Sequence, residues 1–122
     1  MFKRFRYRRV DEAPRARYRE PFLNAADIIW PVFIVPGRGI RQELAAMPGV
    51  FHYSVDQLLP DLEKYIRQGL SSVLLFGVPA QKGIEQAYSA DGLVQSAVRQ
   101  IKQKFPRLEV ITDVCLCSYS ED

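Results

Sequence analysis

The sequence has few of the residues from which metal and catalytic sites are most often built. It contains two cysteines, Cys115 and Cys117, and one histidine, His52, among 122 residues. Two cysteines only two positions apart give no disulfide framework, which excludes the small secreted proteins that several disulfides hold together. The two thiols could therefore either bind a metal or pack in the core. His52 precedes the first predicted helix in a loop, and we expect it to have no catalytic role.

Long apolar runs are absent as well. No stretch approaches the roughly 18 apolar residues of a membrane-spanning helix, and the N-terminus is charged where a signal peptide would be apolar. With 48% hydrophobic and 25% charged residues, the composition is that of a globular protein. We therefore expect a cytoplasmic protein with no membrane partner.

Positive charge is concentrated at the N-terminus. The first 19 residues hold eight Lys or Arg and two acidic residues, a net charge of +6, whereas the whole chain carries +3. Clustered arginines neutralise phosphates and aromatic rings stack on bases, so a small α/β module that binds nucleic acid through this arm is one interpretation. The aromatic residues in question are Phe2, Phe5, Tyr7 and Tyr18. No nucleic-acid-binding motif follows, which favours an arm that packs on a partner subunit and a protein without a nucleic-acid partner.

The rest of the chain predicts alternating strands and helices. Short runs of β-branched, aliphatic and aromatic residues predict buried strands at 27–35, 72–76 and 108–114. Pro31 cannot donate a ladder hydrogen bond, so we expect a bulge or interrupted pairing there. The proline- and glycine-rich segment 36–49 is predicted to be a loop, too long for a tight hairpin.

Two helices are predicted between the strands. The first begins at Ser54 as N-cap, with Gln57 as its capping-box partner and Gly69 just past its end. The second begins at Asp91 as N-cap and ends at 105–106. Apolar residues at helical spacing give each helix one face for the core: Leu58, Leu59, Leu62, Tyr65 and Ile66 in the first, and Leu93, Val94, Ala97, Val98 and Ile101 in the second.

Strand, helix, strand, helix, strand is the order of a parallel sheet with right-handed crossovers. An open doubly wound sheet and a (β/α)₈ barrel both begin in this way. A barrel needs about 250 residues, so this chain would supply only part of one. The predicted division is a basic arm at 1–24 and a folded α/β part at 25–122.

Chemistry is expected at the end of the third strand, because reactive residues of parallel α/β proteins gather at the carboxyl ends of strands. If the extended conformation continued, Asp113, Cys115 and Cys117 would point to one side, and Val114 and Leu116 to the other. Two thiolates at this spacing can both reach a Zn²⁺ at about 2.3 Å. On spacing alone, however, a buried core pair is the more common arrangement.

Five segments in order resemble the zinc-dependent porphobilinogen synthases, also called 5-aminolevulinate dehydratases. They are IIWPVFIV at 28–35, GIRQELAAMPGV at 39–50, LFGVP at 75–79, DGLVQSAVR at 91–99 and ITDVCLCSY at 111–119. The last is the most specific, since it resembles the zinc-binding segment of that family. The resemblance covers nearly the whole chain and favours metal binding by Cys115 and Cys117.

The resemblance implies the first three β/α units of a TIM barrel preceded by an extended N-terminal arm. The family condenses two molecules of 5-aminolevulinate to porphobilinogen, with loss of two waters, in haem and other tetrapyrrole biosynthesis. The resemblance also implies Zn²⁺ as a cofactor, held by Cys115, Cys117 and a third cysteine, and is compatible with an additional Mg²⁺. Asp113 matches an aspartate that faces the active site, and the arm matches one that wraps a neighbouring subunit in a homo-oligomer, usually an octamer.

Two parts of the family's machinery have no counterpart in these residues. The third zinc cysteine would follow in a segment containing GHC, and the sequence ends at Asp122 before it. Two Schiff-base lysines would lie on later strands. The only lysines after Lys3 are Lys64, Lys82, Lys102 and Lys104, which are predicted to be solvated surface residues. We therefore expect residues 1–122 alone to be inactive.

Overall fold

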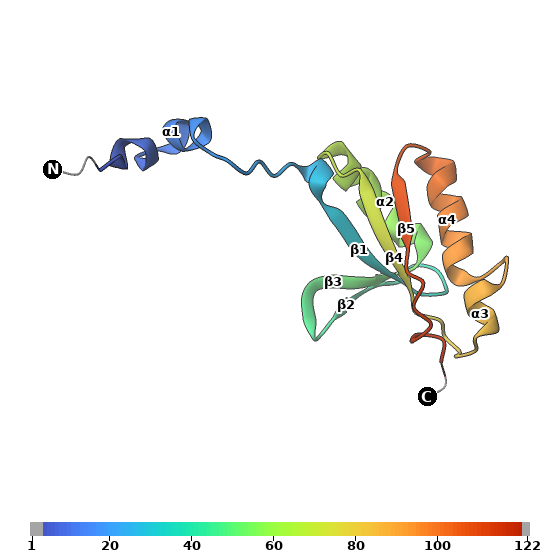
Figure 1. Cartoon of the computed structure of the whole chain (residues 1–122). Coiled ribbons are helices and arrows are strands. Elements are labelled where there is room, and N and C mark those ends of the chain that lie inside the picture. Colours follow the sequence, from blue (N-terminus) through green and yellow to red (C-terminus); the bar gives the residue numbers. More distant parts are fainter. Residues whose placement is uncertain (1–3, 121–122) are drawn as a thin grey trace.

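The computed structural model describes residues 4–120, so Phe2 and Lys3 of the basic arm and the last two residues lie outside it. A five-stranded sheet forms the centre, in the order β2-β3-β1-β4-β5 (Figure 1). The elements in chain order are η1 (Arg6–Arg9), α1 (Glu12–Arg17), η2 (Ala25–Asp27), β1 (Ile29–Ile34), β2 (Arg41–Leu44), β3 (Met47–Tyr53), α2 (Val55–Arg67), β4 (Ser72–Gly77), α3 (Glu85–Tyr88), α4 (Leu93–Lys104) and β5 (Glu109–Thr112).

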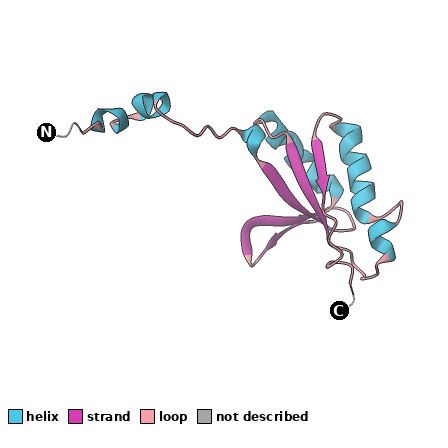
Figure 2. Ribbon diagram, viewed as in Figure 1, coloured by secondary structure: helices cyan, strands magenta, loops and turns pink. Residues whose placement is uncertain are grey.

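The three predicted strands are β1, β4 and β5, and they pair in parallel in the order of the chain. Both long helices pack on the same face of this sheet. Their buried residues form one core with alternate strand residues: Leu58 and Leu62 of α2, Ala97 and Ile101 of α4, Val32 and Ile34 of β1, and Val73 and Leu75 of β4. Figure 2 shows the two long helices beside the strands.

This arrangement distinguishes between the two predicted architectures. A doubly wound sheet carries helices on both faces, whereas a (β/α)₈ barrel keeps its strands in chain order and all its helices outside. Strands β1, β4 and β5 and the two long helices follow the barrel pattern, so the prediction of its first β/α units is confirmed. Strand β3, which also runs parallel to β1, lies on the other side of β1 and outside this order. The face without helices is more open: Pro31 and Ile29 are exposed, and Phe33 and Phe76 are half-buried.

Pro31 causes no bulge, contrary to the prediction. The pairing of β1 with β4 runs without a shift from Ile29 to Ile34, and Pro31 lies opposite Leu74. The N–H of Val35 donates to Tyr53 O, on the side of β3. Because successive residues of a strand turn their N–H groups to opposite sides, Pro31 also faces that side. There β3 pairs with β1 only at Phe33 and Ile34, so the missing N–H interrupts no ladder.

The segment predicted to be a loop contains a β-hairpin instead. Strands β2 and β3 pair antiparallel, with a register shift between Glu43 and Leu44, and β3 joins the sheet beside β1. The side chain of Arg41 fixes the hairpin to α2, because its Nε lies 3.2 Å from Asp61 Oδ2. Tyr53 donates its hydroxyl to the same carboxylate oxygen at 2.7 Å. Burial, together with Asp61, raises the pKa of Tyr53 to about 12, which keeps this donor protonated.

The predicted helix starts are correct in place but wrong in detail. Ser54 is the N-cap of α2, yet its hydroxyl accepts from Ile40 N–H at 2.9 Å and makes no capping bond to a backbone N–H of the helix, so the capping box with Gln57 is wrong. Gly92, not Asp91, is the N-cap of α4, and Asp91 instead pairs with Arg99 at 3.0 Å. The short helix α3 precedes it in a segment predicted to be a loop.

The N-terminal arm lies apart from the sheet, joined to it by an extended stretch (Figure 1). It is not extended throughout, because η1 and α1 fold against each other. The guanidinium of Arg8 lies between two rings, with its Cζ 4.4 Å from the Phe5 centroid and 4.6 Å from that of Tyr18. Cation–π contacts of this kind give the arm a local structure that its arginine content alone did not predict.

The shared core of the two helices should carry much of the stability. Leu62 is fully buried, so replacing it with alanine removes packing on both α2 and the sheet. We expect Leu62→Ala to lower the free energy of unfolding by about 2–5 kcal/mol, measured by urea denaturation followed by circular dichroism. Leu23→Ala is the matched control, since Leu23 is 76% exposed, and it should change stability by less than about 0.5 kcal/mol. Equal effects of the two substitutions would contradict this packing.

Candidate functional site

The predicted site residues lie in a loop, Asp113–Tyr119, that we call the site loop. Strand β5 ends at Thr112, whose partner is Leu75 in β4. The N–H of Asp113 still donates to Leu75 O, at 3.4 Å, and the chain then leaves the sheet. The site loop therefore begins at the carboxyl end of a parallel strand, as predicted. The prediction that the strand continues through Cys117, with side chains alternating, is wrong.

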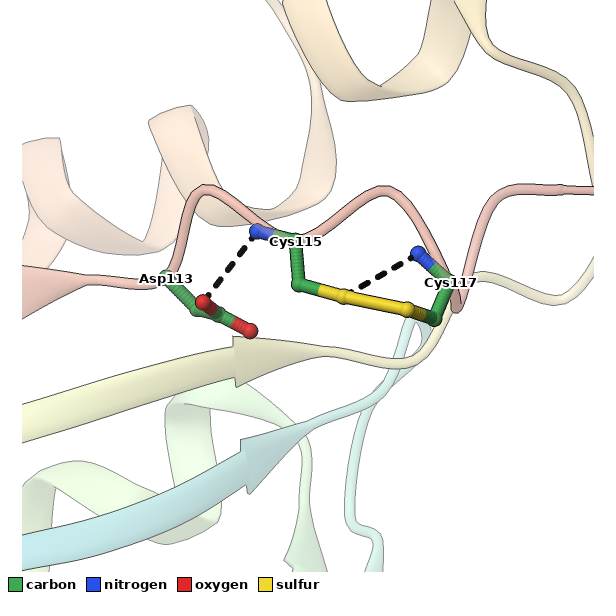
Figure 3. Close-up of a disulfide and its surroundings, with 3 residues drawn as sticks. All are labelled: Asp113, Cys115 and Cys117. Atoms are coloured by element: carbon green, nitrogen blue, oxygen red, sulfur yellow. Dashed lines mark hydrogen bonds between the residues drawn. A yellow bond between two sulfur atoms is a disulfide. The ribbon is translucent and has the colours of Figure 1, made fainter.

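Local hydrogen bonds shape the site loop. Asp113 accepts the Cys115 N–H on Oδ1 at 3.1 Å, and Cys117 donates its N–H to Cys115 Sγ at 3.3 Å. Figure 3 shows the Asp113 carboxylate and both cysteine side chains on the same side of the loop. The grouping of one carboxylate and two sulfurs therefore arises from a turn and not from strand alternation. All three residues are exposed, and none is part of the packed core.

The two sulfurs are joined in a disulfide, a pairing that the sequence analysis did not expect. The Cα atoms of Cys115 and Cys117 are 5.6 Å apart, and both side chains point toward one another (Figure 3). Reduction would leave two thiols that face a common point. Thiolates, not disulfides, are metal ligands, so metal binding requires the reduced form.

The reduced pair would fit two corners of a tetrahedral zinc site. Such a site places sulfurs about 2.3 Å from the metal, and neighbouring thiols in one turn can reach that geometry. Within residues 4–120 no group of three or more His, Cys, Asp or Glu side chains could hold a metal ion. Any further ligand would therefore come from outside this part of the chain.

An aromatic row borders the site loop on the sheet face that the helices leave uncovered. Phe33 and Phe76 stack with ring centroids 5.4 Å apart, and His52 meets Phe33 edge-on at 5.9 Å. These residues lie at the carboxyl ends of β1, β3 and β4. The row could form an apolar floor next to Asp113, and the sequence analysis did not single it out. The sequence could have indicated it, since Phe33 and Phe76 directly follow the core residues Val32 and Leu75 and so point to the opposite face of the sheet.

The site loop also borders a cavity of about 650 Å³, which Asp113, Cys115 and Tyr119 help to line. Apolar side chains from α3, α4 and the loop line it, including Tyr88, Val94, Val114 and Leu116. Val114 is 89% exposed and Leu116 49%, so these two residues turn away from the core.

Tyr119 is the one buried residue of the site loop, and the sequence analysis assigned it no role. It is 7% exposed, and burial raises the pKa of its phenol. Its hydroxyl lies over Gly77, where a Cβ would come within 2.4 Å of the oxygen. The feature of the sequence that could have identified Tyr119 is its place as an aromatic residue two positions after Cys117.

The lysines lie where they were predicted, on the surface. Lys64, Lys82, Lys102 and Lys104 are all exposed. Lys102 donates to the carbonyls of Pro106 and Leu108, and Lys104 pairs with Glu63 at 3.1 Å. Lys82 precedes Gly83, whose N–H donates to Tyr119 O of the site loop.

The fold and the site together define a class: a segment of a (β/α)₈ barrel with a carboxylate and two sulfurs after the carboxyl end of the parallel strand β5. A family model described as delta-aminolevulinic acid dehydratase matches residues 2–122. The chain belongs to the delta-aminolevulinic acid dehydratase family, which confirms the resemblance read from the sequence.

Relatives and a solved structure agree with this assignment. The chain is 40% identical to a delta-aminolevulinic acid dehydratase of Ruminiclostridium josui, over 98% of this chain and 60% of that protein. It is 42% identical to the one of Halalkalibacterium halodurans, over 98% of this chain and 37% of that protein. The Toxoplasma gondii enzyme, solved in complex with the reaction product porphobilinogen, superposes with a TM-score of 0.87 at 26% identity, over 99% of this chain and 35% of that one.

The chain thus spans 60% or less of the length of these relatives. The described residues supply the start of a barrel, its arm and one candidate site. None of the helices in that part of the chain is long and apolar enough to cross a membrane.

Exposure of both cysteines has a chemical consequence. After reduction, Cys115 and Cys117 should react with Ellman's reagent without denaturant, because neither is buried. We expect the parent protein to release two more thiol equivalents per chain than the Cys115→Ser/Cys117→Ser variant under native conditions. No difference until denaturant is added would mean that the thiols are buried, which would contradict the described loop.

Proposed function

We propose that the protein containing this chain condenses two molecules of 5-aminolevulinate to porphobilinogen, with loss of two waters, and that it does so with zinc. Membership of the family supports the reaction. The observation that carries the zinc assignment is the convergence of two exposed sulfurs beside Asp113 at the carboxyl end of β5. Bound zinc would act as a Lewis acid on a substrate oxygen held at this site.

Asp113 would have two roles in this site. Its Oδ1 accepts the Cys115 N–H and thereby shapes the turn that presents the thiols. Its other carboxylate oxygen would accept a hydrogen bond from a substrate amine, which orients the substrate, or take up a proton. The carboxylate is exposed, so a substrate can reach it for either task.

The remaining machinery would come from residues beyond this segment. In this proposal the two Schiff-base lysines and the third cysteine lie in the longer part of the protein, as in the family that the sequence resembles. Phe33 and Phe76 would exclude water from the base of the site. An additional Mg²⁺ stays a prediction from the resemblance, because no cluster within residues 4–120 could hold it.

The zinc assignment is tested by removing both thiols. In the longest natural protein that contains this chain, Cys115→Ser/Cys117→Ser should abolish stoichiometric zinc binding, measured by metal analysis. Porphobilinogen formation should fall roughly 1,000-fold, equivalent to about 4 kcal/mol of transition-state stabilisation. Ser118→Ala is the matched control, since Ser118 is an exposed neighbour in the same loop and should leave both values unchanged. Full activity of the double variant and in the presence of a chelator would rule out the zinc assignment.

The partner that we propose for the arm is a second copy of the chain, in a homo-oligomer that is an octamer in the resembled family. The arm projects from the barrel segment and exposes Phe5, Tyr7, Tyr18, Phe22 and Leu23, which a neighbouring subunit could bury (Figure 1). Five arginines line a hollow in the arm together with Phe5 and Tyr18, and they would meet acidic groups of the neighbour.

Deletion of residues 1–19 tests the role of the arm. If the arm joins subunits, the deletion should lower the molar mass of the assembly measured by light scattering, because the exposed apolar contacts are lost. Arg8→Lys, which keeps the charge and loses the planar stacking on Phe5 and Tyr18, should weaken the assembly less than the deletion. An unchanged molar mass after deletion would contradict this role.

The alternative of a nucleic-acid-binding module has no support from the relatives, all of which are named as dehydratases. The arm's charge alone favoured it. We also propose a cytoplasmic location, which rests on the sequence composition.

A further inference from the structure

Tyr119 is buried in a loop whose other residues are exposed. Asp113 to Ser118 are all exposed, whereas Tyr119 is 7% exposed. A single buried aromatic residue at the end of an exposed segment can fix that segment, because its packing limits the conformations open to the residues before it.

The hydroxyl of Tyr119, together with Val94, occupies a space that only glycine leaves free. A Cβ at Gly77, the last residue of β4, would lie 2.4 Å from Tyr119 Oη and 2.7 Å from Val94 Cγ2. Gly77 has no positive φ, so its backbone conformation is open to other residues. The close approach of the tyrosine and of α4 is therefore the reason for glycine at this position.

Backbone hydrogen bonds fasten the same end of the site loop. Gly83 donates its N–H to Tyr119 O at 2.9 Å, which ties the loop to the segment after β4. Tyr119 donates its own N–H to Leu116 O at 2.9 Å and closes the turn that contains Cys117. With Asp113 bonded to Leu75 at the other end, the loop is attached to β4 and its following segment at both ends.

We propose that Tyr119, seated against Gly77, is a positioning residue that holds the thiols of Cys115 and Cys117 toward one ligand point. This inference rests on the proposed zinc function. Tyr119 touches neither metal nor substrate in this proposal. It acts by fixing a turn, so that the two thiols lose little freedom when a ligand joins them.

The test compares zinc affinity in variants of the longest natural protein that contains this chain, reduced and stripped of metal. Affinity is measured by competition with a chromogenic chelator. Tyr119→Ala should weaken zinc binding about 10- to 100-fold, the range for residues that orient ligands. Tyr119→Phe should stay within about threefold, because the ring and its packing remain. Tyr88→Ala is the control: Tyr88 borders the same cavity and is 74% exposed, so its loss should have no effect.

Gly77→Ala supplies a second, independent variant. It should displace Tyr119 and weaken zinc binding to about the level of Tyr119→Ala. In the Tyr119→Ala background, Gly77→Ala should cost less zinc affinity than it does in the parent protein, since the contact with Tyr119 is already lost and only the crowding of Val94 Cγ2 remains. Fully additive losses would show that Gly77 and Tyr119 act separately and would overturn the proposal. The helix content of each variant, measured by circular dichroism, should be unchanged. That result would show that the loss of zinc affinity comes from the position of the thiols and not from unfolding.

A zinc-independent measurement separates this inference from the proposed function. Phenylarsine oxide bridges two thiols that lie close together, so its affinity reports how the pair is held without any metal. Tyr119→Ala should weaken arsenical binding about tenfold or more. If Cys115→Ser/Cys117→Ser leaves zinc binding intact, the zinc assignment fails, and weaker arsenical binding by Tyr119→Ala would still support positioning. If zinc binding depends on the cysteines but Tyr119→Ala leaves zinc and arsenical affinities unchanged, only the present inference is overturned.

Discussion

The packing of two helices on one face of the parallel sheet is the interaction on which the rest of the structure depends. Val32, Ile34, Val73 and Leu75 bury themselves against α2 and α4 and give the segment its only large apolar core within residues 4–120. Burial of this surface is the main favourable contribution to folding. Because the helices occupy one face, the other face and the carboxyl ends of the strands are left for chemistry. The site loop and the aromatic row both lie there.

The sequence predicted the parts of the fold in which local pattern and tertiary packing agree. Leu58 and Leu62 lie on one helical stripe, and the same stripe faces the sheet. Gly69 follows α2 with a φ of 102°, the left-handed conformation predicted for a residue past a helix end. The location of the candidate site after β5 could also be predicted, because strand ends are where barrels place their reactive groups, although β5 ends at Thr112 and the predicted strand ran to 114.

Other parts could not be predicted, because their cause lies in contacts distant in sequence. The β2–β3 hairpin was predicted to be a loop because prolines and glycines punctuate residues 36–49. The contact of Arg41 with Asp61 on α2, distant in sequence, helps to order it. Ser54 has the residue type of an N-cap, but Ile40 of the hairpin competes for its hydroxyl. In the site, hydrogen bonds of the turn at Asp113 replaced the alternation expected of a strand.

Pro31 has a consequence for how the molecule meets other chains. Within the described residues, the part of β1 that precedes Phe33 has no partner strand on the side of β3. An unpaired edge of this kind can pair with a strand of another molecule. At its middle, the proline offers a carbonyl but no N–H, so an added strand would find one of its acceptors without a donor. Pro31 costs β1 nothing in its own sheet, and it discourages intermolecular β-pairing along this part of the β1 edge.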